Sequence, residues 1–105
     1  MHIQVNTDNH IEGREALVAR IEAAVMSSLD RFSEHITRIE IHLSDENGVK
    51  NGQNDKRCLM EARLEGRQPT AVTCQADTLE QAVAGATDKL KRSLASTLER
   101  LDGHR

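Results

Sequence analysis

Residues 78–101, TLEQAVAGATDKLKRSLASTLERL, are the stretch around which the rest of the chain is organised. Thr78 is a suitable helix N-cap, and Gly103 follows the last leucine as a stop signal. Between them, apolar residues recur at three- and four-residue steps, the spacing of one helical face: Leu79, Val83, Ala86, Leu90, Leu94, Leu98 and Leu101. The sequence therefore predicts a long amphipathic helix here.

A second stripe of this helix holds only cations and small polar residues. At about 100° per residue, it lies roughly a third of a turn from the leucines and contains Lys89, Arg92, Ser93, Ser96 and Arg100. Residues 1–87 have nine Lys or Arg and fourteen Asp or Glu, whereas residues 88–105 have five and three. The overall charge of −3 thus conceals a modest basic patch at the carboxy-terminal end.

Length and composition limit the architecture. A chain of 105 residues, 30% charged and 37% hydrophobic, is expected to form one domain over residues 1–105. Phe32 is the single aromatic residue, so the core has to be aliphatic. No apolar run is long enough to span a membrane, and no secretory signal is recognisable at the amino terminus. We expect a soluble, cytoplasmic protein without a membrane partner.

The preceding residues predict one helix and four strands. The helix is expected over residues 14–32 and the strands, which alternate apolar and polar residues, over 1–6, 37–44, 57–65 and 70–76. Residues 45–56 predict a long mobile loop. The order β-α-β-β-β-α favours an α+β fold: a four-stranded mixed sheet with a parallel first pair and both helices on one face. Its αβββα portion is similar in fold to double-stranded-RNA-binding domains.

Cys58 and Cys74 raise the question of a disulfide. A hairpin that turns at residues 66–69 places Cys74 opposite a residue near position 61, so Cys58 is about two positions out of register. That diagonal is unfavourable for a disulfide. We therefore expect two reduced thiols packed as small hydrophobic groups.

Catalytic and metal motifs are absent from the sequence. The five histidines have no metal-ligand spacing and belong to separate expected segments: His2, His10, His35, His42 and His104. There is no P-loop, GxGxxG or GxSxG motif, and the serine clusters, Ser27-Ser28 and Ser93 with Ser96, lie within predicted helices. We predict no catalytic residue, metal, cofactor or small-molecule substrate, and hence no enzyme.

RNA binding has a more specific signal. The candidate phosphate contacts are the cations of the last eighteen residues: Lys89, Arg92, Lys91, Arg100 and Arg105. On charge alone, a solvated helix face balanced by Asp88, Glu99 and Asp102 is the better explanation of these cations. With one aromatic residue, the chain cannot stack bases on a platform, so any contact should be with the backbone of folded RNA.

The last helix also resembles a known family. Ala82-Val83, Gly85 and residues 88–94 (DKLKRSL) are similar to the run AI-x-G-x-x-DKL-x-RQL of the ribosome hibernation promoting factors and ribosome-associated translation inhibitors, once called sigma-54 modulation proteins. The resemblance covers nearly the whole chain, as the short form. It implies binding to the small ribosomal subunit and its rRNA in the tRNA and mRNA channel, with steric inhibition of translation. It also implies that Lys89 and Arg92 contact phosphates, with Lys91 at a variable position of the motif.

The chain departs from this pattern in three places. Residues 96–100 (STLER) replace further lysines, Glu80 stands where the family often has tyrosine, and Thr78 where it has aspartate. Fewer phosphate contacts imply weaker binding at cellular salt. The alternative is a non-enzymatic protein-interaction module of the same fold, a monomer or weak homodimer that pairs through the sheet face or an edge strand.

Overall fold

The computed structural model describes residues 1–8, 14–45 and 55–102, with side chains up to residue 99. Its elements are β1 (His2–Thr7), α1 (Arg14–Ser28), a 3₁₀ turn η1 (Asp30–Phe32), β2 (Ile36–Asp45), β3 (Lys56–Leu64), β4 (Thr70–Ala76) and α2 (Leu79–Asp102). The predicted order and all four strands are confirmed, with strand ends that differ by one residue at most. The predicted loop falls largely on residues 46–54, outside the described part of the chain.

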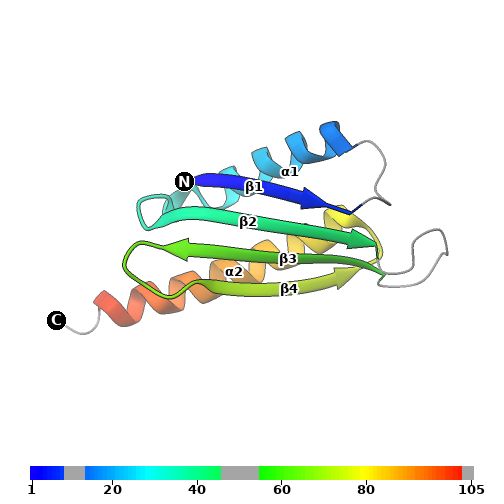
Figure 1. Ribbon diagram of the computed structural model, residues 1–105. Helices are drawn as coiled ribbons and strands as arrows, with labels where there is room; N and C mark the ends of the chain where they lie inside the picture. The colour runs from blue at the N-terminus through cyan, green and yellow to red at the C-terminus, as the bar shows by residue number, and fades with distance from the viewer. Residues whose placement is uncertain (9–13, 46–54, 103–105) are drawn as a thin grey trace.

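One mixed sheet has the strand order β1-β2-β3-β4, with both helices on one of its faces (Figure 1). β1 and β2 pair in parallel, Ile3 opposite Ile39, because α1 supplies the crossover between them. The remaining strand pairs are antiparallel. α1 packs over β1, and α2 packs over β3 and β4. The predicted α+β architecture is therefore correct.

The core lies between the sheet and the helices and is aliphatic. Ile39, Ile41, Met60, Leu90 and Leu94 are completely buried. They come from the alternate positions of β2 and β3 and from the predicted leucine face of α2, whose burial removes a continuous apolar surface from water. This packing fixes which flanks of α2 remain exposed.

Thr78 caps α2 as the sequence predicts. Its hydroxyl oxygen accepts a hydrogen bond from the backbone N–H of Gln81 at 3.1 Å, and its carbonyl accepts one from the N–H of Ala82 at 3.0 Å. The predicted stop at Gly103 lies outside the described residues.

The predicted end of the first helix is wrong. α1 ends at Ser28, and the chain then tightens into η1, where the N–H of Phe32 donates to the carbonyl of Leu29 at 2.9 Å. This three-residue step directs both Leu29 and Phe32 into the core. Ala24 and Ser28 of α1 are exposed.

The predicted register of the last hairpin is also wrong. Cys58 pairs directly with Cys74, not with a residue near position 61, and both thiols are free. The pairs run from Lys56 opposite Ala76 to Ala62 opposite Thr70, so they are centred on position 66. Gly66 has a positive φ of 70°, a conformation that glycine adopts without strain, and this allows the turn to form earlier than a turn centred within residues 66–69.

Candidate nucleic-acid interface

Lys89 and Arg92 lie on the flank of α2 that borders β4, and both are exposed. Lys89 Nζ donates a hydrogen bond of 2.7 Å to the backbone carbonyl of Thr73 in β4. An ammonium group has three donors and keeps its charge when it bonds a carbonyl. Lys89 therefore remains a fixed cation with donors to spare.

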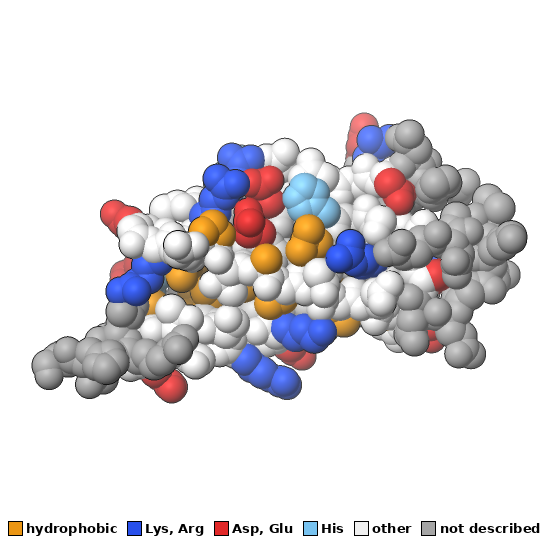
Figure 2. All heavy atoms as spheres, turned by 60° about the horizontal axis from the view of Figure 1, so that its bottom comes forward, with side chains coloured by type: hydrophobic (Ala, Val, Ile, Leu, Met, Phe, Trp, Pro, Cys, Tyr) orange, Lys and Arg blue, Asp and Glu red, His pale blue; other side chains and the backbone are white. Residues whose placement is uncertain are grey.

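Helical geometry gathers these side chains into one surface. Gly85, Lys89, Arg92 and Ser96 follow one another at steps of three or four residues, which places them on one side of the helix. We call this surface the β4 flank. Gly85 lies against the Cys74 side chain and Lys89 bonds Thr73, so the flank is adjacent to the edge strand. In Figure 2, Lys and Arg side chains lie along the lower margin, where α2 runs.

Neither cation of the β4 flank is paired with a carboxylate of the described residues. Within the part of the chain that the structure describes, no ion pair joins Lys89 or Arg92 to an acidic side chain. Asp88, next to Lys89 in sequence and about 100° from it around the helix, lines the hollow beside α1. Among the described residues, the flank therefore presents positive charge that no carboxylate pairs with.

Lys91 does not share this surface. It is two residues from Lys89, about 200° around the helix, and is partly buried. The structure describes the remaining candidates, Arg100 and Arg105, only in part. α2 extends through position 100, but the side chain of Arg100 and all of Arg105 lie outside the described residues. The structure thus brings Lys89 and Arg92 together and separates Lys91 from them.

The exposed face of the sheet has cations of a different kind. Glu40 lies 3.4 Å from Arg38 Nε and 3.4 Å from Arg63 Nη2, and Arg63 Nε also lies 3.4 Å from Glu61. Red and blue side chains accordingly stand side by side on this face in Figure 2. Because these arginines already pair with carboxylates, we expect them to attract the phosphates of RNA less strongly than Lys89 and Arg92 do.

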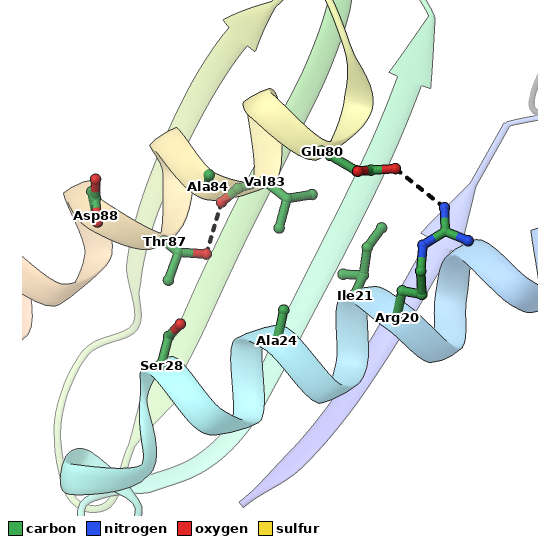
Figure 3. Close-up of a pocket in the computed structure, with 9 residues that line it drawn as sticks. All are labelled: Arg20, Ile21, Ala24, Ser28, Glu80, Val83, Ala84, Thr87 and Asp88. Carbon is green, nitrogen blue, oxygen red and sulfur yellow. Dashed lines mark hydrogen bonds and ion pairs between the residues drawn. The ribbon is translucent and has the colours of Figure 1, made fainter.

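A shallow hollow of about 340 Å³ lies between α1 and α2 (Figure 3). Its aliphatic part comes from Ile21, Ala24, Val83 and Ala84, and an ion pair of 3.2 Å between Arg20 and Glu80 spans its rim. The Thr87 hydroxyl donates to the carbonyl of Val83 at 2.7 Å. The nine lining residues from the described chain include no histidine or cysteine, so they form no nucleophile–imidazole pair.

Other features bear on metal sites, thiol chemistry and membranes. Within residues 1–8, 14–45 and 55–99, no three His, Cys, Asp or Glu side chains group as metal ligands do. Burial, with a smaller contribution from Cys74, raises the pKa of Cys58 to about 12, which makes this thiol a poor nucleophile. Neither helix, over the residues described, is long and apolar enough to cross a membrane.

One partner in this surface could not be found from the sequence. The side chain of Thr73 is exposed on β4, but the group that Lys89 contacts is its backbone carbonyl. A pattern of side-chain types does not show what the backbone carbonyls of an edge strand contact. Only the packing of α2 beside β4 shows which of them Lys89 meets.

The fold matches solved structures of other proteins. A ribosomal subunit interface protein from Coxiella burnetii aligns with a TM-score of 0.71 at 20% identity, covering 94% of this chain and 99% of that one. The N-terminal domain of Protein Y from Thermus thermophilus aligns with a TM-score of 0.69 at 20% identity, covering 89% and 94%. At this identity the likeness defines a class of fold. A comparison with curated proteins found no significant match.

The sequence itself identifies the family. Residues 3–102 match the family described as sigma 54 modulation protein / S30EA ribosomal protein. The match spans α2 and the β4 flank as well as the sheet. This chain belongs to that family, as the resemblance of its last helix implied.

Proposed function

We propose that this protein is a ribosome-associated hibernation factor. It binds the small ribosomal subunit in the cytoplasm, near the channel for tRNA and mRNA, and inhibits translation by occupying that space without a chemical step. The observation that carries the proposal is family membership over residues 3–102. The cations of the β4 flank, which pair with no described acid, give the protein a physical means of contacting rRNA phosphates.

The proposed contacts have an order of importance. Lys89 comes first because its bond to Thr73 fixes it at the surface, and Arg92 is next to it on the same flank. Arg100 is eleven residues beyond Lys89, about three helical turns, which places its Cα on the same side of α2. Lys91 and Arg105 are secondary candidates. Each phosphate contact releases condensed counterions, so binding should weaken as salt rises.

Co-sedimentation with ribosomes in a sucrose gradient tests the proposal. The wild-type chain should travel with the small subunit at low salt, and Lys89→Glu or Arg92→Glu should shift most of it to the top. Lys91→Glu makes the same change in charge on the other side of α2 and should have the smaller effect. If the wild-type chain stays at the top even at low salt, the proposal is wrong.

A protein-interaction module is the competing proposal, and the structure bears on where it would pair. Lys89 covers a carbonyl of the β4 edge, and a lysine at an edge strand discourages a further strand from adding there. Pairing would therefore use β1. A stable, RNA-independent homodimer in light scattering would favour this function over ribosome binding.

A further inference from the structure

The two thiols of this protein face each other across β3 and β4. Cys58 and Cys74 are direct partners in the antiparallel ladder, and both belong to the positions that face α2. Directly opposed residues have Cα atoms about 4.5 or 5.5 Å apart, which lies within the roughly 4.4–6.8 Å that disulfides span.

The surroundings of the two thiols differ. Cys58 is completely buried, whereas Cys74 is only partly buried on the edge strand. The Cys74 sulfur rests against Gly85 of α2, where an added methyl group would overlap it, and donates a weak 3.7 Å bond to the carbonyl of Gln75. A small oxidant therefore reaches Cys74 first, and Cys58 is positioned behind it to react second.

We propose that Cys58 and Cys74 form a redox-active pair that a peroxide converts into a cross-strand disulfide. The Cys74 thiolate attacks one peroxide oxygen, the O–O bond breaks, and the departing hydroxide leaves as water after protonation, which gives a sulfenic acid. Cys58, whose thiol is protonated, then gives up its proton as its sulfur attacks the Cys74 sulfur, and the displaced hydroxide takes that proton and leaves as water. Two thiols and one hydrogen peroxide thus give one disulfide and two waters. A small dithiol reverses the reaction by exchange.

Disulfide formation acts on the junction between β4 and α2. To bond Cys58, the Cys74 sulfur moves toward β3 and relaxes its contact with Gly85. Lys89 lies one helical turn after Gly85 and bonds the residue that precedes Cys74. The disulfide therefore forms next to the segment that positions Lys89. Its formation does not depend on the proposed function.

Peroxide treatment of the reduced full-length chain, followed by alkylation of remaining thiols and intact-mass measurement, tests this inference. The expected product is monomeric, has lost two hydrogen atoms, takes up no alkylating label and gives a linked peptide containing both cysteines. Dithiothreitol should restore both labelling sites.

Two variants check the order of the steps. Cys58→Ser should stop at a sulfenic acid on Cys74 that dimedone traps, while Cys74→Ser should leave Cys58 reduced over the same time. The proposal is overturned if both wild-type thiols remain open to alkylation, if the link joins two copies of the chain, or if Cys74 proceeds to sulfinic acid while Cys58 stays reduced. The wild-type peptide map decides the question even if a variant fails to fold. Ribosome binding does not enter the measurement.

Discussion

Gly85 allows α2 to approach β4 because it has no side chain to meet the Cys74 sulfur. Alanine is favoured over glycine inside a helix by about 1 kcal/mol, while overpacking a tight contact costs about 1–3 kcal/mol. Two opposing effects therefore act at one position, and the sulfur decides which dominates.

A double-mutant cycle separates these effects. We expect Gly85→Ala to stabilise the Cys74→Ala variant by about 1 kcal/mol, because the helix gains propensity without a clash. In the wild-type background the same change should be neutral or destabilising. Urea denaturation gives the four free energies of unfolding, and equal effects of Gly85→Ala in both backgrounds would show that the sulfur imposes no constraint.

Cys58 makes stability depend on alkaline pH. Its pKa is raised from 9.0 to about 12 in the folded chain, so the folded state keeps a proton that the unfolded state loses. The stabilisation is complete below pH 9 and is lost as the pH rises toward 12, at up to about 1.4 kcal/mol per pH unit. Cys58→Ala should flatten this decline between pH 9 and 10, relative to its own stability at pH 8. Parallel curves for the two proteins would contradict the assignment.

At the scale of elements, the start of α2 depends on one hydroxyl group. Thr78 accepts the N–H of Gln81, one of the four donors that the first helical turn leaves unpaired. Thr78→Ala should lower the free energy of unfolding by about 1 kcal/mol, whereas Thr78→Ser should keep most of it. Chemical denaturation of the three proteins provides the measurement, and a loss in Thr78→Ser as large as that in Thr78→Ala would argue against capping.

For the whole molecule, the distribution of charge matters more than its sum. The chain is acidic overall, yet its sheet-face arginines are paired with Glu40 and Glu61, while Lys89 and Arg92 on α2 are not paired with any described acid. A net charge of −3 therefore does not prevent a local positive surface from meeting RNA.

The salt dependence of ribosome binding distinguishes these two sets of cations. Each lost phosphate contact should reduce the slope of log affinity against log salt by about 1. We expect this reduction for Arg92→Gln and a much smaller one for Arg63→Gln, whose cation is already paired on the sheet. Equal slopes for both variants would place the RNA contact elsewhere.

What the sequence determined by itself is the set of elements and their order. The leucine spacing of α2, the alternation of the strands and the Thr78 cap are local patterns. They depend on the backbone periodicity of neighbouring residues, so the sequence alone predicts them. The motif around Asp88–Leu94 also pointed to the correct family, because it depends on neighbouring residues along one helix.

Only the tertiary structure decided how the elements meet. The pairing of Cys58 with Cys74, the early end of α1 at Ser28, and the hydrogen bond of Lys89 to the Thr73 carbonyl each depend on contacts between distant residues. A turn that forms one or two positions earlier shifts every cross-strand pair, and a helix flank has a neighbour only after the core has oriented the helix. Packing sets these relations, because many weak contacts outside the local sequence together select the register and the rotation.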